Sequence, residues 1–338
     1  MEVKTVYRRL ALAAACLAFV VVVVGAFVRL MDAGLGCPDW PGCYGELSPA
    51  HAEEHIANAV QAQGGEHGPV SMRKAWKEMF HRYIASTLGL LIFGLAVLAW
   101  RWRRTLGRSP ALASSLFVLV VFQGLLGMWT VTLLLKPVIV TLHLLGGMAT
   151  LALLAWLALR HREARPAIHR SAAHRLRPWA LLGIAVVVAQ IALGGWVSSN
   201  YAALACVDLP TCHGVWKPEM DFTHGFQLVR ELGRTAAGGH LAYEALTAIH
   251  WTHRVGALVT LIYIGALAFA LYRTRGLARY GAVLAGVLLT QFALGVANIL
   301  AGLPLAVAVA HNAVAAILLV TLVMINFALS RADQPATP

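Results

Sequence analysis

Residues 11–29 read ALAAACLAFVVVVVGAFVR, an apolar run whose only charged residue is its last. A helix rises about 1.5 Å per residue, so this run is long enough to cross a hydrocarbon core of roughly 30 Å. Arg8 and Arg9 precede it as they would in a signal peptide, but it lacks a convincing small-residue cleavage site. It also aligns with an apolar segment in the interior of the chain. We therefore expect a permanent membrane-spanning helix.

The rest of the chain repeats this pattern of long apolar runs. Of its 338 residues, 59% are hydrophobic and only 12% are charged, which is too apolar for a soluble protein of this length. Lipid offers no hydrogen-bond partner to exposed backbone, so the spans must be helical. The sequence predicts an all-α integral membrane protein with eight transmembrane helices, at residues 11–29, 82–100, 111–132, 138–159, 179–198, 253–272, 281–300 and 305–329.

The net charge of +12 reflects topology rather than nucleic-acid binding. Lysine and arginine gather before the first predicted span and after the second, fourth and sixth, in connections that share one side of the membrane. The positive-inside rule assigns that side, and both termini, to the cytoplasm. We expect a multi-pass protein of the bacterial cytoplasmic (inner) membrane, in contact with lipid and with no nucleic-acid partner.

The chain is a tandem duplication with a near-constant offset of about 170 residues. Each half contains four spans, so both halves enter the membrane in the same direction, as a parallel repeat. We predict two four-helix bundles, residues 1–159 and 179–330, joined by a cytoplasmic linker at 160–178 and followed by a disordered tail at 331–338. The matching features are Cys37 and Cys43 with Cys206 and Cys212, His81-Arg82 with His253-Arg254, residues 123–127 with 291–295, and His143 with His311.

One pair of histidines in each half lies near the outer ends of predicted spans: His81 with His143, and His253 with His311. An ionisable side chain at membrane depth indicates function, and two matched pairs indicate two equivalent cofactor sites. Neutral imidazoles supply both axial ligands in bis-histidine haem. Hydrogen-bonded histidines without a ligand are the alternative. Zinc or copper fits less well, because such sites usually need three or four close ligands.

Glu78 distinguishes the two halves. It precedes His81 by three residues and shares its helix face, whereas the equivalent position in the second half is His250. A carboxylate beside a haem can transfer protons or position a substrate. The alternative is an interfacial acid that favours a helix N-terminus. The asymmetry predicts chemistry in the first half, and storage or relay of electrons in the second.

Arg82 and Arg254 directly follow their histidines. A guanidinium at the membrane surface suits a haem propionate. Snorkelling of the side chain to water explains the same placement, so the sequence leaves both interpretations open.

Four of the five cysteines form two closely spaced pairs, in long outer loops expected at residues 30–80 and 199–250. An oxidising compartment permits the disulfides Cys37–Cys43 and Cys206–Cys212. Each is either a staple that shapes its loop or a redox pair that exchanges electrons. The absence of a CxxC motif favours the staple.

Three stretches together resemble the haem A synthase family of membrane enzymes (CtaA/Cox15-type). They are residues 34–43, GLGCPDWPGC, residues 78–82, EMFHR, and residues 123–127, QGLLG, with His143 and the second-half echoes beside them. The resemblance covers nearly the whole chain, and the CPDWP loop combined with ExxHR is specific. The second loop, residues 206–212, echoes the first only loosely.

The resemblance implies a reaction and an assignment of sites. Members of the family oxidise the C8 methyl group of haem O to a formyl group by successive hydroxylations, which gives haem A for terminal oxidases, and they carry a bound haem b. His81 and His143 would bracket haem O, with Glu78 as the essential carboxylate, while His253 and His311 would ligate haem b. The reaction needs an electron donor. A haem O synthase partner and a homo-oligomer are both compatible with the resemblance.

Two other function classes compete with the enzyme. A two-haem membrane cytochrome b that only carries electrons predicts symmetric sites, and Glu78 counts against it. A haem transporter predicts polar residues along the full membrane depth, whereas the inner halves of the predicted spans are nearly all apolar.

Overall fold

The computed structural model describes residues 2–63, 65, 68, 70–161 and 168–333, and these contain helices and no β-strand. Among them, eight long helices are apolar enough to cross a membrane. The predicted class, an all-α multi-pass membrane protein, is confirmed. The long helices are α1 (Glu2–Leu30), α3 (Met72–Arg101), α5 (Ala111–Thr132), α6 (Pro137–Arg160), α7 (Arg170–Ser199), α9 (Tyr243–Tyr272), α10 (Ala278–Leu300) and α11 (Leu305–Asp333). The short ones are α2 (Glu53–Ala62), α4 (Arg103–Leu106) and α8 (Phe222–Gly225).

Each predicted span lies inside one long helix, but α3 and α9 begin well before the expected spans. α3 begins at Met72, where the hydroxyl of Ser71 accepts a hydrogen bond from the backbone N–H of Lys74 at 3.2 Å. This is an N-cap, which stabilises a helix start wherever it occurs in the membrane profile. α9 begins at Tyr243. The last residues of both expected outer loops are therefore helical.

Helices extend into parts of the segments that were expected to be a linker and a tail. α7 begins at Arg170 and carries Pro178 inside the helix, and α11 reaches Asp333. No glycine or proline interrupts residues 329–333, so the helix continues into the segment that was expected to be a disordered tail. The centre of the expected linker, residues 162–167, and the end of the tail, residues 334–338, lie outside the described residues.

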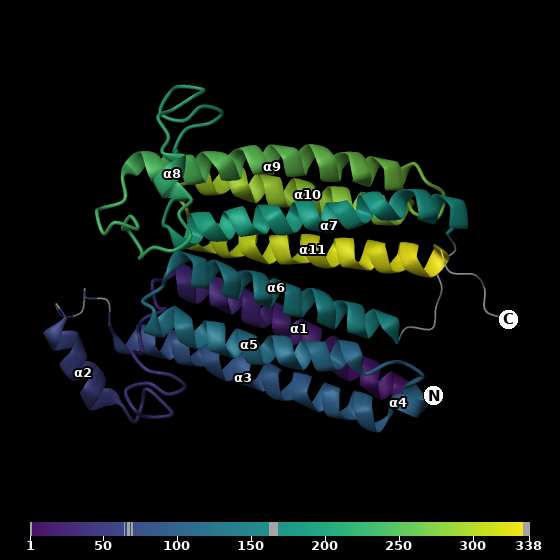
Figure 1. Ribbon diagram of the computed structural model, residues 1–338, viewed down its shortest axis with the longest axis horizontal. Coiled ribbons are helices and arrows are strands. Elements are labelled where there is room, and N and C mark those ends of the chain that lie inside the picture. The colour runs from purple at the N-terminus through teal and green to yellow at the C-terminus, as the bar shows by residue number, and fades with distance from the viewer. Residues whose placement is uncertain (1, 64, 66–67, 69, 162–167, 334–338) are drawn as a thin grey trace.

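The long helices form two groups of four that follow the order of the duplication. α1 and α5 each pack against α3 and α6, and α7 and α10 each pack against α9 and α11. Figure 1 shows the two groups lying along one another, with the first half of the chain below the second. Between the groups, α1 contacts α11, and α6 contacts both α7 and α11. The assignment of separate functions to the two halves stays a prediction.

Equivalent positions of the two halves meet at the C-terminal ends of α1 and α7. Arg29 donates a hydrogen bond to the carbonyl oxygen of Ser198 at 2.7 Å, and the hydroxyl of Tyr201 donates to Asp32 at 2.7 Å. The partners in each pair are 169 residues apart, which is also the offset between the two cysteine pairs. Equivalent positions contact one another only beside the axis that relates them. An axis between the two halves therefore passes through these contacts.

The long loops gather at one end of the molecule, so its two ends differ. In Figure 1, α2, α8 and the long loops lie at one end, and the beginning of α1 and the end of α11 lie at the other. A small cluster of buried side chains, separate from the main core, fixes the first long loop to the beginning of α3. Its members include Cys37, Cys43, Ile56, Val70 and Met79.

Candidate functional site

In the first half, His81 lies in α3 and His143 in the second turn of α6, both inside membrane-spanning helices. Each ring lies against a glycine of a neighbouring helix. A Cβ added to Gly25 of α1 would lie 3.0 Å from Cε1 of His81, and one added to Gly127 of α5 would lie 3.4 Å from Cε1 of His143. The glycines therefore leave room for the imidazoles between the helices. The two rings are near enough to interact electrostatically.

The second half repeats this geometry. A Cβ on Gly194 of α7 would lie 3.1 Å from Cε1 of His253, and one on Gly295 of α10 would lie 3.2 Å from Cε1 of His311. These two rings also interact electrostatically. Gly25 and Gly194 occupy equivalent places, and the sequence analysis missed both. The only signal for them is a glycine at the same point of two aligned apolar spans.

Several ring nitrogens of these histidines have no hydrogen-bond partner within the described structure. The Nδ1 atoms of His81, His143 and His311 are buried and have no hydrogen-bond partner among the described residues. Buried polar atoms are normally paired, so such exceptions indicate a bound group. No cluster of three or more His, Cys, Asp or Glu that could hold a bare metal ion occurs in the described part of the chain. Two imidazoles per half, each seated on a glycine, instead fit the axial ligands of a haem iron.

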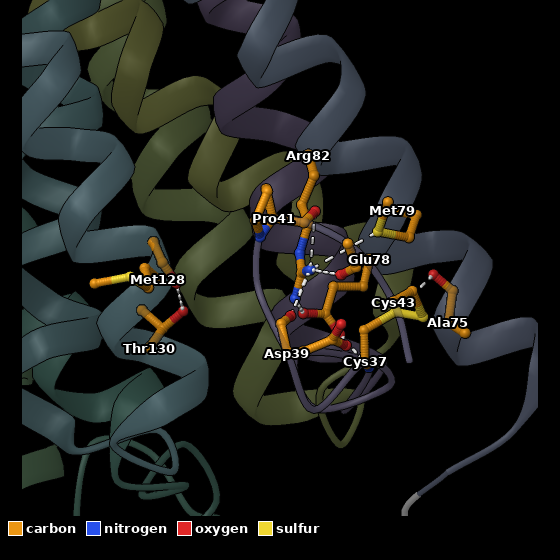
Figure 2. A network of polar contacts seen from close by, with 12 residues as sticks. Cys37, Asp39, Pro41, Cys43, Ala75, Glu78, Met79, Arg82, Met128 and Thr130 are labelled. Atoms are coloured by element: carbon orange, nitrogen blue, oxygen red, sulfur yellow. Dashed lines mark hydrogen bonds and ion pairs between the residues drawn. A yellow bond between two sulfur atoms is a disulfide. The ribbon is translucent and has the colours of Figure 1, made fainter. Parts of the chain in front are cut away.

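Glu78 connects α3 to the disulfide loop (Figure 2). Its side chain is buried, with the residue 4% exposed. Oε2 accepts a hydrogen bond from the backbone N–H of Cys37 at 2.9 Å, and Oε1 pairs with the guanidinium of Arg82 at 2.5 Å. Arg82 also donates to the carbonyl oxygens of Asp39, at 2.8 Å, and of Gly42. The carboxylate and the guanidinium together hold the loop against the helix.

His250 occupies the same place in the second half. Its Nδ1 accepts a hydrogen bond from the backbone N–H of Cys206 at 3.2 Å, and Nε of Arg254 lies 3.4 Å from its Nε2. Arg254 also donates to the carbonyl oxygens of Asp208 and Thr211, both at 2.9 Å. Glu78 and His250 therefore share a structural role that the sequence could not reveal, because it depends on the path of the loops.

Both arginines direct their guanidinium groups at loop carbonyls. These contacts explain why the Arg82 side chain is only 11% exposed. Contact with loop carbonyl oxygens is a third role, which differs from both roles expected from the sequence, namely propionate binding and snorkelling. The predicted contact of Arg82 and Arg254 with haem propionates stays a prediction.

The cysteine-bearing loops of the two halves are built alike. The structure contains the disulfides Cys37–Cys43 and Cys206–Cys212. In each loop the second cysteine forms a β-bridge three residues onward, to Glu46 in the first and Val215 in the second. The two loops therefore share one architecture although their sequences are only loosely similar.

An aspartate organises each of these loops. Asp39 accepts two backbone hydrogen bonds, at 2.6 and 2.8 Å, and Asp208 accepts two at 2.8 and 3.0 Å. Asp208 also accepts a hydrogen bond from the hydroxyl of Thr211 at 2.6 Å. These hydrogen bonds, led by that from Thr211, hold the pKa of Asp208 well below its ordinary value because they favour the carboxylate.

The fold and the site define a class of all-helical, multi-pass membrane proteins with a histidine pair in each of two repeated halves. Residues 8–323 match the family model COX15-CtaA, which describes a cytochrome oxidase assembly protein. The chain therefore belongs to the COX15-CtaA family of cytochrome oxidase assembly proteins.

Several relatives match along nearly their whole length. The heme A synthase of Shewanella oneidensis is 42% identical over 307 residues, which cover 91% of this chain and 92% of that protein. The heme A synthase of Halalkalibacterium halodurans is 28% identical and covers 92% of this chain and 93% of its own. The heme A synthase of Rhizorhabdus wittichii is 29% identical, over 94% of this chain and 92% of that protein. The similarity therefore includes both halves of the chain and the four helices that carry the histidine pairs.

Proposed function

We propose that this protein is a haem A synthase, a membrane oxidoreductase that converts the C8 methyl group of haem O to a formyl group by successive hydroxylations. The observation that carries the proposal is the similarity to the Shewanella enzyme, at 42% identity over 91% of the chain. A histidine pair seated on glycines in each half supplies the ligands that such an enzyme needs. The reading as a cytochrome b carrier or a transporter has no comparable support.

The two histidine pairs receive different roles. His81 and His143 hold the substrate haem O in the first half, and His253 and His311 hold haem b in the second. Bound haem iron supplies the redox chemistry that no side chain of this protein can provide. The imidazoles are held against glycines of neighbouring helices, which would position a haem iron between them.

Glu78 is the catalytic carboxylate of this proposal. It lies three residues before His81 on α3, and therefore on the same side of the helix. Its contact with Arg82 holds the carboxyl group in place, and a positioned carboxyl group can exchange protons with a reacting substrate. Movement of the disulfide loop, and of its Cys37 N–H, away from Glu78 would free Oε2 for that purpose.

Arg82 and Arg254 are proposed to bind haem propionates while they share their N–H groups with the loop carbonyls. An arginine has five donors in a fixed fork, which permits such sharing.

The protein is proposed to lie in the bacterial inner membrane with both termini in the cytoplasm. The ends of α3, α6 and α9, which the arginine-rich connections follow in the sequence, lie at the same end of the molecule as the beginning of α1 (Figure 1), in agreement with the positive-inside rule. The histidine sites then lie towards the outer leaflet, where a lipophilic haem O enters from the lipid. An electron donor, a haem O synthase and a second copy of the chain are the partners to be sought.

Co-expression with a source of haem O, in cells without another haem A synthase, tests the activity. Extraction and chromatography of the pigments should yield haem A. Recovery of haem O alone, from protein that is folded and abundant, would refute the proposal. In a separate test, His253→Met should alter the optical spectrum of bound haem b, and unchanged haem bands would remove haem b from the second half.

A further inference from the structure

A buried amide in the first half has no acceptor for its N–H groups. Gln123 lies on α5 and is 8% exposed, on the buried face of that helix with Leu116 and Leu126. Among the described residues, it is the one fully buried side-chain amide whose nitrogen lacks a hydrogen-bond partner. Lipid cannot supply an acceptor, so this amide is costly to bury unless a bound molecule accepts from it.

The amide lies one helical turn deeper in the membrane than His143. Gln123 precedes Gly127, the glycine that seats His143, by four residues, and its amide lies against Gly146, three residues after His143 on α6. Residues three or four apart share a helix face. The amide and the imidazole therefore lie along the same contact between α5 and α6, with the amide about 5 Å further from the outer loops.

The second half differs at this point. A Cβ added to Gly146 would overlap the amide nitrogen of Gln123, and the residue at the equivalent place in α11 is Val314. The amide nitrogen of Gln291, the equivalent of Gln123, lies instead 3.2 Å from Nε2 of His311. The two glutamines thus occupy the same position of the repeat, but their amides lie in different places.

The substrate of the proposed reaction differs from haem b by a polar group. Haem O carries a hydroxyethylfarnesyl group where haem b carries a vinyl group, and the hydroxyl is on the carbon bonded to the porphyrin. This substituent lies on the edge of the porphyrin opposite the propionates. With the propionates at Arg82, as proposed above, the edge that bears the hydroxyl faces inward, towards the turn that contains Gln123.

We propose that Gln123 recognises the hydroxyl group of haem O, with its amide nitrogen as the donor and the hydroxyl oxygen as the acceptor. The first half thereby selects haem O over haem b, whose vinyl group accepts no such hydrogen bond. The inference rests on the haem A synthase function proposed above and adds the residue that identifies the substrate.

The physical reason is the cost of an unpaired polar group. A site built to hydrogen-bond a hydroxyl rejects a ligand without it more strongly than an apolar pocket can, because the buried amide is then left without a partner. Gly146 contributes to this recognition, since its missing side chain leaves the space that the amide occupies. Val314 removes that space in the second half, which suits a haem with vinyl groups only.

Two iron porphyrins that differ only in hydroxyl groups separate this contact from the farnesyl tail. Haematohaem carries two hydroxyethyl groups where mesohaem carries two ethyl groups. Each is titrated into protein purified from cells that make haem b but no haem O, and Soret difference spectra give the dissociation constants. We expect Gln123→Leu to lower the preference for haematohaem over mesohaem by about two- to tenfold, the effect of one hydrogen bond. Gln291→Leu, the same change in the second half, is the matched control and should leave this preference unchanged.

A second variant tests the same contact without replacing the glutamine. Gly146→Val should displace the amide and lower the preference by a similar factor, and Val314 shows that the repeat accepts valine at this position. This variant decides the proposal if Gln123→Leu does not fold. The wild-type preference in either folded variant would overturn the proposal, and so would an equal loss of affinity for both porphyrins, which a purely structural role predicts. A wild-type protein that binds neither porphyrin would instead refute the function proposed for the first half, before any variant is made.

Discussion

Replacing Glu78 by histidine separates its structural contact from its proposed chemistry. Glu78→Ala cannot do so, because it leaves the backbone N–H of Cys37 and the buried guanidinium of Arg82 without their partner. Removing one member of a buried ion pair typically costs about 3–5 kcal/mol, enough to release the loop. The second half shows that a histidine fits this position, since Nδ1 of His250 accepts the equivalent N–H of its loop at 3.2 Å.

We therefore expect Glu78→His to preserve the loop and lose the chemistry. The variant keeps the acceptor for Cys37 N–H, and Arg82 keeps its contacts with the loop carbonyl oxygens, so the cost in stability should be below the roughly 3–5 kcal/mol expected for Glu78→Ala. A positioned proton acceptor contributes roughly 10²- to 10⁴-fold to a rate, so conversion of haem O should fall by at least about 100-fold. The assay is the ratio of haem A to haem O in extracted pigment, with thermal stability and bound haem measured on the same preparation.

The reverse exchange supplies the control. His250→Glu should fold, retain haem b and convert haem O as the wild type does, because it alters only the loop contact of the second half. If Glu78→His converts haem O at close to the wild-type rate, the carboxylate takes no part in the chemistry. Glu78 would then be a loop anchor alone, with the same purpose as His250.

Three further perturbations follow from single contacts. Gly194→Val should displace the ring of His253, since even a Cβ would lie 3.1 Å from it, and pigment analysis should find haem b lost while the protein remains in the membrane. Tyr201→Phe removes one hydrogen bond between the halves and should lower the free energy of unfolding by about 0.5–1.5 kcal/mol, which thermal denaturation would detect; an unchanged midpoint would mean that this contact does not stabilise the interface. The hydrogen bonds led by that from Thr211 lower the pKa of Asp208, so the loop should be fully stabilised above the ordinary aspartate pKa of about 3.9 and lose that stabilisation as the pH falls further. Hydrogen exchange of the loop should show this acid dependence in the wild type and not in Asp208→Asn.

The membrane architecture was largely predictable from the sequence, because it follows from hydropathy and charge alone. Every expected span lies within one long helix. The helix ends were not predictable in the same way, since hydropathy marks where lipid begins and not where hydrogen bonding stops. α3 extends outward to the Ser71 cap, and α7 continues through Pro178. Both extensions consist of residues too polar to count as membrane span.

The candidate site was predictable to the level of residue type and no further. The histidine pairs follow from the duplication, but their seating on Gly25 and Gly194 does not, since a single glycine in an apolar span has many explanations. The roles of Arg82 and Arg254 were open because the sequence does not show that a loop folds back onto the outer turns of the helices. Contacts between segments so far apart are set by tertiary structure.

The duplication limits how the two halves can differ in function. They share the helix order, the loop architecture and the glycine-seated histidines, so none of these features can account for the proposed division between a substrate haem and a resident haem. The differences next to the histidines are few: Glu78 against His250 at the loop contact, and Val21 against Gln190 at the ring nitrogen. The first pair differs in charge and hence in the ability to move a proton. The second differs in whether an amide group contacts Nδ1 of the histidine. Any difference in function between the halves must therefore arise from positions such as these, where the repeated architecture carries different side chains.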